Sequence, residues 1–443
     1  MASGSDRRGD IAPLCSRVVS ATWGWRTELA VVGLLGLVDH LAWRLGGTGA
    51  ELVAVGTIGI VFWRFPALAR WLRLRLVEGS YLRWWVKVAR HARLTSPFGL
   101  YPVLKSVRPV PAGEVLRVDL PVGMDSTHLE RACQTIAAAM AVGEVRVAAS
   151  PANAACVEVT VVRSDPLASP LGIWPSLHAT HTSLWEPVVV GVDEFGEMVW
   201  VSLPEHNLLI GGEPGAGKSN LLSLLVAAAA LDPTVALTLM DGKQVELAPW
   251  SASADYFVGP DLSHARFVLS QLRGELEERY GHLLSQRKRK VGPDDRMGLH
   301  VVVVDELAFF VKGKNTTERA DIAEALRDLV SRGRAAGFIV VCATQKPSHD
   351  VVPTYLRDLF SYRCALRCTS PEASDTILGA GWATQGYSAA TIDPGARGVG
   401  FLLAEGGVPR RMRAFAMGDE ELESLAGRAE ALRRTTRFGG MKS

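Results

Sequence analysis

One stretch of the sequence constrains the fold more than any other. Residues 208–225 read L-L-I-G-G-E-P-G-A-G-K-S-N-L-L-S-L-L. Three apolar residues are typical of the end of a buried parallel strand, the following residues form a Gly-rich loop, and Lys218 opens an Ala- and Leu-rich helix. The order strand, loop, helix with the spacing G-x-x-x-x-G-K-S predicts a phosphate-binding loop. An ordinary Gly-rich turn would not require all three elements in this order.

The chemistry of a nucleotide explains the residue types in this loop. Backbone N–H groups converge on the β- and γ-phosphates of ATP only where side chains leave room, which favours glycine. Lys218 supplies a cation near the bridge between these phosphates, and the Ser219 hydroxyl suits Mg²⁺. The predicted nucleotide-binding residues are Gly212, Glu213, Pro214, Gly215, Ala216, Gly217, Lys218, Ser219 and Asn220.

The chain of 443 residues is long enough for two or three domains. Its net charge of +2 says little about partners, but basic residues gather before residue 100. The six cysteines form no C-x-x-C pair, which favours reduced thiols in a cytosolic body. We expect a membrane anchor over 1–95, a small α/β module with a linker over 96–182, a P-loop motor over 183–417 and a helix or tail over 418–443.

Two apolar segments, Leu29–Leu45 and Leu52–Phe65, are separated by a short Gly-rich turn. Each has about the length that a bilayer crossing requires, so they predict a transmembrane helical hairpin. Asp39 and His40 interrupt the first segment, and a buried or surface-lying helical pair is the alternative. Arginines flank both segments on the outside, which would place both ends of the hairpin and the motor in the cytoplasm of a multi-pass cell-membrane protein. The segment Leu72–Leu94 reads as a basic amphipathic helix along the inner leaflet.

The module that follows alternates strand patterns with one helical pattern. The helix is expected over Ser126–Val142, with Ser126 or Thr127 as its cap. The stretch Ser164–Thr182, rich in Pro, Ser and His, resembles a linker. No catalytic constellation is visible in this module, and packing or subunit contact is its expected role.

The third region alternates β-branched runs with helical patterns, which predicts a mostly parallel α/β sheet. Ligands gather at the carboxyl ends of such strands. Four valines end in Asp305-Glu306, where Asp305 can hold Mg²⁺ through water and Glu306 can orient the attacking water. Gln345 ends another strand and could sense the γ-phosphate, although a polar strand cap is the alternative.

Six further motifs carry a family resemblance. They are D-G-K-x-x-E at 241–246, E-x-E-E-R-Y at 275–280, V-V-V-V-D-E at 301–306, G-R-A-A-G at 333–337, A-T-Q-K-P-S at 343–348 and T-I-L-G-A-G at 376–381. With the phosphate loop, they make residues 187–417 resemble the FtsK/SpoIIIE family of double-stranded DNA translocases. The single short hairpin makes the chain look more like the compact Tra proteins of actinobacterial plasmids and integrative elements. After Met417 we expect a single helix and no DNA-reading module.

The resemblance implies a RecA-like ATPase that works as a homo-oligomeric ring, expected to be a hexamer. Double-stranded DNA would pass through the ring and ATP would lie between neighbouring subunits. An arginine supplied in trans is also implied, with Arg334 and Arg363 as candidates and Arg332 as a competitor. A surface role is the ordinary alternative for all three.

Two basic loops are candidates for contact with DNA, Arg287–Lys290 and Lys312–Asn315. Such loops would track phosphates without reading bases, although many charge runs are only solvated. The leading hypothesis is therefore a membrane-anchored, ATP-driven pump for double-stranded DNA, used in conjugative transfer or chromosome segregation. A protein-export ATPase of the type VII secretion kind and a non-catalytic membrane ring scaffold are the alternatives.

Overall fold

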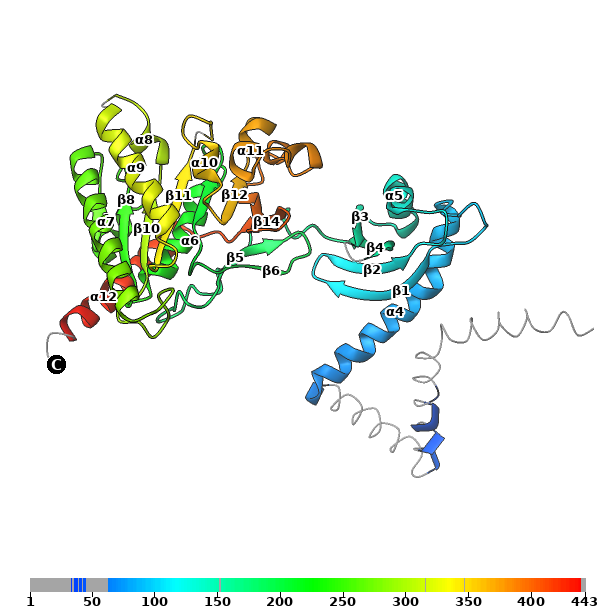
Figure 1. Cartoon of the computed structure of the whole chain (residues 1–443). Helices are drawn as coiled ribbons and strands as arrows, with labels where there is room; N and C mark the ends of the chain where they lie inside the picture. Colours follow the sequence, from blue (N-terminus) through cyan, green and yellow to red (C-terminus); the bar gives the residue numbers. More distant parts are fainter. Residues whose placement is uncertain are drawn as a thin grey trace, which may run out of the picture. The chain divides into compact units, whose positions relative to one another are not determined.

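The computed structural model describes residues 33, 36–38, 40, 41, 43, 44, 63–150, 153–314, 316–345 and 347–439. The chain divides into two compact units, Met1–Asp165 and Pro166–Ser443; many of their helices and strands are labelled in Figure 1. The predicted span Leu29–Leu45 lies partly, and the predicted span Leu52–Phe65 mostly, outside the described residues. Within the described ranges, no helix combines the length and the apolar run that a bilayer crossing needs.

Between residues 66 and 165, the described part of the first unit forms a four-stranded antiparallel sheet that packs with helices α4 and α5. The strands are ordered β1-β2-β4-β3, and both helices contact the sheet. The bounds are α4 (Pro66–His91), β1 (Val103–Val110), β2 (Gly113–Asp119), α5 (Ser126–Met140), β3 (Glu144–Ser150) and β4 (Asn153–Val162). The alternating strands predicted for this module are confirmed. Its helix is capped by Asp125, which accepts from Thr127 Oγ1 at 2.6 Å, rather than by Ser126 or Thr127 as expected.

Helix α4 matches the helical pattern expected over Leu72–Leu94, but its apolar face has a protein partner. Trp85 is 2% exposed, and its Nε1 donates to the Pro102 carbonyl at 2.9 Å. Tyr81 is also buried in the core of this unit. Trp84, by contrast, remains partly exposed. The C-terminal half of α4 is therefore part of the small domain.

The second unit is built on a ten-stranded sheet of order β6-β5-β14-β13-β12-β7-β11-β10-β8-β9. The six strands from β12 to β9 run parallel, and the other four are antiparallel. The strands are β5 (Val188–Asp193), β6 (Met198–Val201), β7 (Leu208–Gly211), β8 (Ala236–Met240), β9 (Tyr256–Val258), β10 (His300–Val304), β11 (Phe338–Thr344), β12 (Tyr362–Leu366), β13 (Val399–Leu403) and β14 (Arg410–Ala414). The predicted mostly parallel sheet is thus present, with an antiparallel extension.

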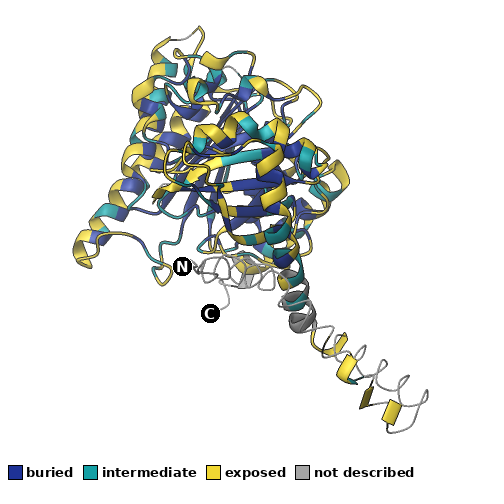
Figure 2. Ribbon diagram, turned by 90° about the vertical axis from the view of Figure 1, so that its right-hand side faces the viewer, coloured by how far each residue is buried: buried dark blue, intermediate teal, exposed yellow. Residues whose placement is uncertain are grey.

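Helices and short 3-10 turns connect these strands. They are α6 (Lys218–Ala230), η1 (Ala248–Ser253), α7 (Leu262–Ser285), α8 (Leu307–Val311), α9 (Thr316–Arg332), α10 (Thr354–Arg357), α11 (Pro371–Leu378), η2 (Ala383–Gln385), η3 (Ala389–Thr391) and α12 (Asp419–Gly439). Every residue of β7, β10 and β11 is buried, as expected for parallel strands covered by helices on both faces. Figure 2 shows buried strands inside and exposed residues on the outer helices.

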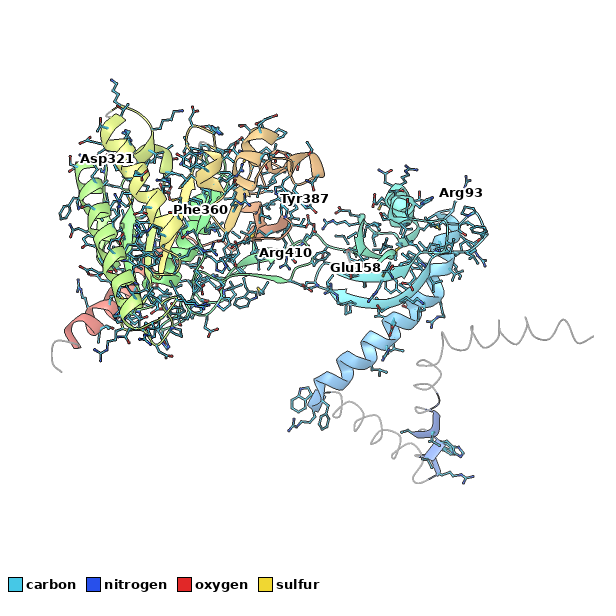
Figure 3. All side chains as sticks on the ribbon, viewed as in Figure 1. Arg93, Glu158, Asp321, Phe360, Tyr387 and Arg410 are labelled. Carbon is cyan, nitrogen blue, oxygen red and sulfur yellow. The ribbon has the colours of Figure 1, made fainter. Side chains whose placement is uncertain are left out.

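The antiparallel extension is held by side chains as well as by its ladder. Arg410 on β14, labelled in Figure 3, donates from Nε to Asp193 Oδ2 on β5 at 2.8 Å. The Asp193 side chain is buried and also accepts from the backbone amides of Phe195 and Glu197. The several donors offset the cost of removing the Asp193 carboxylate from water. Because Arg410 reaches this carboxylate in the observed pairing, the ion pair favours this register of β14 on β5.

The segment expected to be a linker, Ser164–Thr182, contributes to the core of the second unit. Leu167, Trp174 and Leu177 are buried there. Trp174 Nε1 donates to the Val189 carbonyl on β5 at 2.9 Å. Residues from 166 onward therefore fold with the motor.

Helix α12 also packs on the motor, beside the end of α6. Arg433 is 4% exposed and donates to the carbonyls of Ala229, Ala230 and Asp232 at 2.9–3.1 Å. These carbonyls lie at the C-terminal end of α6, where no intrahelical donor remains for them. A guanidinium on α12 thus caps the helix that follows the phosphate loop.

A buried polar network joins α7 to the amino-terminal ends of the parallel strands. Arg279 is 3% exposed, pairs with Glu275 at 2.7 Å and donates to the carbonyls of Gly298 and Ala336. The second Glu275 oxygen lies 2.9 Å from His300 Nδ1 on β10. The E-x-E-E-R-Y motif therefore joins this helix to the sheet.

Burial alone would raise the pKa of Glu275, but the hydrogen bond from His300 and the charge of Arg279 outweigh it and lower the pKa to about 2. A carboxylate with a lowered folded-state pKa stabilises the fold above its ordinary pKa of 4.5, and this contribution is lost as the pH falls toward 2. Because the side chain is 32% exposed, we expect Glu275→Gln to lower the free energy of unfolding at pH 7 by only about 1–2 kcal/mol. Urea unfolding of both proteins between pH 3 and 7 should show the difference shrinking below pH 4.5. A difference that is constant over this range would contradict the assignment.

Candidate nucleotide-binding site

The phosphate loop has the backbone conformation that its glycines permit. It follows β7, and α6 begins at Lys218 as predicted. Gly215 and Gly217 have φ of +77° and +104°, a region that residues with a side chain rarely adopt. A Cβ on Gly217 would also lie 2.7 Å from the Gly398 nitrogen. Glycine is therefore required at position 217 by both conformation and space.

Segments distant in sequence hold the loop in place. The Ala216 carbonyl accepts from Gly398 N at 2.9 Å, and Glu213 N donates to the Arg367 carbonyl at 2.8 Å. The side chains of Glu213 and Arg367 form an ion pair at 2.7 Å. Pro214, by contrast, is exposed at the tip. The base of the loop is fixed while its tip is open to solvent.

Lys218 points back over the loop. Its side chain is 6% exposed, and Nζ donates to the carbonyls of Gly212 and Glu213 at 2.8 and 2.7 Å. Burial lowers the pKa of this ammonium, whereas the charges of Glu306 and Asp305 act in the opposite direction. The lysine thus lies between the loop and the acids at the end of β10, as a phosphate ligand requires.

The side chain of Asn220, one of the predicted nucleotide-binding residues, bonds to the segment that follows β14. Its side-chain amide donates to the Phe415 carbonyl, and its Oδ1 accepts from Met417 N at 2.8 Å. Both polar ends of the side chain are thus engaged by the segment after β14. Asn220 holds the first turn of α6 against that segment, while its neighbour Ser219 is half-buried at the helix start.

Asp305 lies at the carboxyl end of β10, where the sequence placed it. It is 6% exposed, and its Oδ2 has no hydrogen-bond partner within the described part of the chain. Burial, followed by the charges of Asp241, Glu246 and Glu306, raises the pKa of Asp305 to about 6. Because this buried carboxylate oxygen has no hydrogen-bond donor in the described ranges and lies near other acidic side chains, it is suited to binding a cation.

The residues present fit Mg²⁺ bound together with a nucleotide. Asp305 and Ser219 would hold the ion, which would supply positive charge to the phosphates. Among the described residues no group of three or more His, Cys, Asp or Glu side chains forms a metal cluster.

Glu306 is fixed by the neighbouring strand. Its Oε1 accepts from Thr344 Oγ1 at 2.9 Å, and its Oε2 accepts from Gln345 N at 3.1 Å. Both donors lie at the end of β11, which runs between β10 and β7. Glu306 and Gln345 are therefore brought together at the edge of the sheet that carries the phosphate loop.

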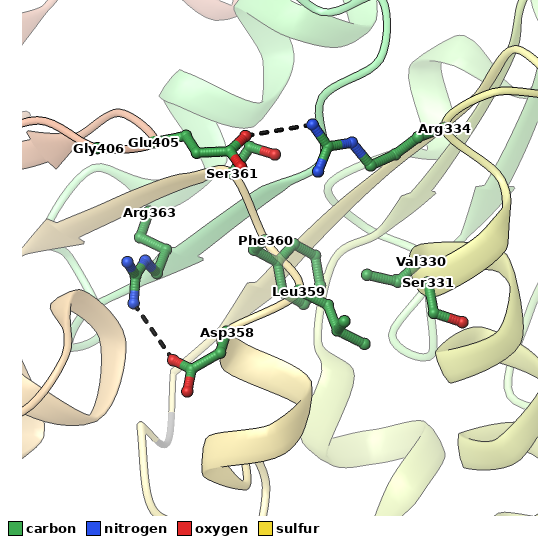
Figure 4. A pocket seen from close by; sticks show the side chains of 10 residues that line it. All are labelled: Val330, Ser331, Arg334, Asp358, Leu359, Phe360, Ser361, Arg363, Glu405 and Gly406. Atoms are coloured by element: carbon green, nitrogen blue, oxygen red, sulfur yellow. Dashed lines mark hydrogen bonds and ion pairs between the residues drawn. The ribbon is translucent and has the colours of Figure 1, made fainter. Parts of the chain in front are cut away.

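Arg334 and Arg363 lie near the amino-terminal ends of the parallel strands, opposite the carboxyl ends that carry the phosphate loop. Arg334 precedes β11, and Arg363 is the second residue of β12, whereas the phosphate loop follows the far end of β7. The two line one cavity of about 170 Å³, shown in Figure 4 with the Arg334–Glu405 pair at 3.2 Å and the Arg363–Asp358 pair at 3.6 Å. Burial lowers the pKa of Arg363. Neither arginine belongs to the phosphate site of its own chain.

The competing arginine, Arg332, is a surface residue. It forms ion pairs with Glu277 at 2.6 Å and Asp328 at 3.3 Å, and its side chain is 42% exposed. These ion pairs fit the surface role that is the ordinary alternative for Arg332.

The two basic loops also lie at opposite ends of the parallel strands. Arg287–Lys290 follows α7 and precedes β10, whereas the 312–314 segment follows the strand that carries Asp305; Asn315 is outside the described residues. Several of their charges are paired internally: Lys288 with Asp295, Lys290 with Glu205 at 2.5 Å, and Lys312 with Asp350 at 2.8 Å. The two loops therefore do not form one continuous surface at either end of the strands.

Sequence reasoning gave no role to Asp241, which shapes the same edge of the sheet. The carboxylate is buried and accepts from the backbone amides of Lys243, Gln244, Val245 and Leu247, each at 2.9 Å. An aspartate followed by glycine at the end of a predicted strand is the signal that could have indicated such a turn.

Comparison with known proteins agrees with this geometry. The FtsK/SpoIIIE family model matches residues 180–383. DNA translocase FtsK of Chlorobaculum tepidum is 30% identical over 226 residues, covering 46% of this chain and 28% of that protein. DNA translocase FtsK of Mycobacterium tuberculosis is 27% identical over 339 residues, covering 70% and 39%. The chain spans only about a third of the length of these curated relatives.

Among solved structures, the pCW3 conjugation coupling protein TcpA, in its monomer form with ATPγS, superimposes with a TM-score of 0.54 at 17% identity. The match covers 78% of this chain and 99% of that one. At this identity the likeness concerns the fold alone. The phosphate loop, the paired acids and the family match together show that the second unit of this chain contains an FtsK/SpoIIIE family domain.

Proposed function

We propose that this protein is an ATP-driven translocase of double-stranded DNA. The observation that carries the proposal is the convergence of Lys218, Asp305 and Glu306 at one edge of the sheet. These groups are suited to binding a nucleoside triphosphate with Mg²⁺ and to its hydrolysis. The names of the matched relatives, DNA translocases, support DNA as the substrate that the motor moves.

In this proposal each residue has a distinct task. The amides of the loop and the start of α6 receive the β- and γ-phosphates, and Lys218 neutralises part of their charge. Asp305 and Ser219 hold Mg²⁺. Glu306 orients the attacking water and accepts its proton, and Gln345 beside it responds to the presence of the γ-phosphate.

The position of Arg334 and Arg363 supports assembly into a ring, which we propose to be a hexamer. Both lie at the edge of the sheet opposite the phosphate loop, so neither belongs to the nucleotide site of its own chain. In a head-to-tail ring they would approach the nucleotide of the next subunit and stabilise the charge that develops during hydrolysis. DNA would pass through the middle of that ring.

The amino-terminal residues support attachment to the cell membrane. The apolar segments Leu29–Leu45 and Leu52–Phe65, with basic residues outside both, suit a hairpin anchor with the motor on the cytoplasmic side. A membrane-attached DNA pump would serve DNA transfer between cells or the clearing of chromosomes from a septum.

The test is ATP hydrolysis by the detergent-solubilised full chain with and without double-stranded DNA. We expect hydrolysis that DNA stimulates several-fold and that rising salt suppresses, because phosphate contacts release counterions. Hydrolysis that ignores DNA would contradict the translocase proposal and favour a protein-export ATPase. Absence of hydrolysis would favour a non-catalytic scaffold.

A second prediction concerns the loop 287–290. Replacing Arg287, Lys288, Arg289 and Lys290 together with serine should weaken DNA-stimulated hydrolysis and leave basal hydrolysis unchanged. Because Lys288 and Lys290 form internal ion pairs, a double variant in Arg287 and Arg289 alone separates DNA contact from loop stability. If both arginines contact phosphates, the slope of log affinity against log salt should fall by about 2. An unchanged slope would remove the loop from the DNA path.

A further inference from the structure

A second lysine lies at the edge of the sheet that carries the phosphate site. Strand β8 ends at Met240, which is paired with Val304 immediately before Asp305. The Asp305 amide donates to the Met240 carbonyl at 3.0 Å. The turn that follows β8, with Gly242 and Lys243, is therefore the neighbour of Asp305 on the side away from β7.

Two contacts fix the conformation of this turn. The first is Asp241, whose buried carboxylate accepts four backbone amides from Lys243 onward. The second is Gly242, where an added Cβ would lie 2.4 Å from the ring of Phe309. That ring is in turn covered by the Arg319 guanidinium at 5.5 Å. The backbone of Lys243 is thus held in place while its side chain is exposed.

The surroundings of Lys243 contain the groups of the phosphate site. Its charge adds to the lowering of the Lys218 pKa that burial causes, and it opposes the rise in the Asp305 pKa. Its side chain forms no ion pair with another described residue. Lys218, by contrast, is buried and binds two loop carbonyls. Lys243 is therefore a second ammonium beside the phosphate site, with freedom to move.

The two sides of the loop indicate which end of a nucleotide this lysine would meet. On one side the loop contacts Gly398, which donates to Ala216 at 2.9 Å. On the other side lie Asp305 and Glu306, where Mg²⁺ and the attacking water would bind. Lys243 lies beyond Asp305 on this second side. A phosphate held between the loop and these acids would therefore lie on the side of the sheet where the turn with Lys243 is found.

We propose that Lys243 binds the γ-phosphate of a nucleoside triphosphate and stabilises the negative charge on its oxygens during hydrolysis. The inference rests on the proposed function of the site. Lys243 would be a further cation from the same chain, located between the acids Asp305 and Glu306 and the solvent. A flexible surface lysine can close on a bound phosphate as a point charge, at the cost of side-chain entropy.

The experiment compares Lys243→Ala and Lys243→Arg with wild type and with Lys105→Ala, an exposed lysine of the first unit. The readouts are kcat for ATP and the affinities for ADP and for ATPγS with Mg²⁺. We expect Lys243→Ala to bind ADP within twofold of wild type, to bind ATPγS more weakly and to lose on the order of tenfold in kcat. Arginine should restore part of both losses, and Lys105→Ala should match wild type.

Equal losses for ADP and ATPγS would show a structural effect on the loop and overturn the proposal. A Lys243→Ala protein with wild-type kcat and wild-type ATPγS affinity would also overturn it. If the wild type hydrolyses no ATP, the proposed function fails. The difference between ADP and ATPγS binding still decides the role of Lys243 in that case.

Discussion

Replacing Lys218 with alanine is expected to lower ATP turnover by at least about 100-fold, because one charged donor at a developing phosphate charge typically contributes two to three powers of ten. The structure gives the reason: the ammonium lies between the loop carbonyls and the acids at the end of β10. No other described lysine is both buried and bonded to the loop. The measurement is steady-state hydrolysis with saturating Mg²⁺ and ATP.

Because Lys218 also bonds to the carbonyls of Gly212 and Glu213, its loss could loosen the loop. Lys218→Met keeps most of the side-chain volume without the charge and serves as the second variant. Thermal unfolding of both variants should stay near that of wild type, since the helix and its apolar contacts are unchanged. Hydrolysis by Lys218→Ala within tenfold of the wild-type rate would show that the site has been misassigned.

Glu306→Gln is expected to retain ATP and Mg²⁺ binding while turnover falls by about 100-fold or more, because a general base contributes two to four powers of ten. Glutamine has the shape of glutamate and can still accept from Thr344 Oγ1, but it cannot take a proton from water. The measurement pairs ATPγS affinity with single-turnover hydrolysis.

Thr344→Val is the matched control for this variant. It removes the donor at 2.9 Å from Glu306 Oε1 but leaves the carboxylate and its bond from Gln345 N. We expect a much smaller loss of turnover than for Glu306→Gln. If the two variants are equally impaired, the position of the carboxylate rather than its charge limits the reaction. If Glu306→Gln hydrolyses ATP at the wild-type rate, another group must act as the base.

Local sequence patterns specify the strands and the helix that carry the candidate site. The strand, loop and helix around Lys218 are adjacent in sequence, and their apolar periodicity indicates each element. The same holds for β10 and the acids that follow it. Parallel strands bring their carboxyl ends to one edge, so the meeting of Lys218 with Asp305 follows from fold class alone.

Other features depend on contacts between residues distant in sequence, and local patterns do not specify them. Whether Asn220 faces a nucleotide or the segment after β14 is decided by residues almost 200 positions away. The burial of Trp174 likewise depends on β5, so composition alone made its segment resemble a linker. Likewise, the pattern of Leu72–Leu94 predicts an amphipathic helix but does not specify what covers its apolar face, which includes Trp85, bonded to the Pro102 carbonyl.

The two ends of α6 are both bound to one short stretch near the C-terminus. Asn220, in its first turn, bonds to Phe415 and Met417, and the carbonyls at its last turn bond to Arg433. Helix α6 is therefore held at its first turn by the segment before α12 and at its last turn by α12 itself. Displacement of α12 would leave the carbonyls at the end of α6 without the Arg433 donors, at the far end of the helix whose first turn belongs to the phosphate site.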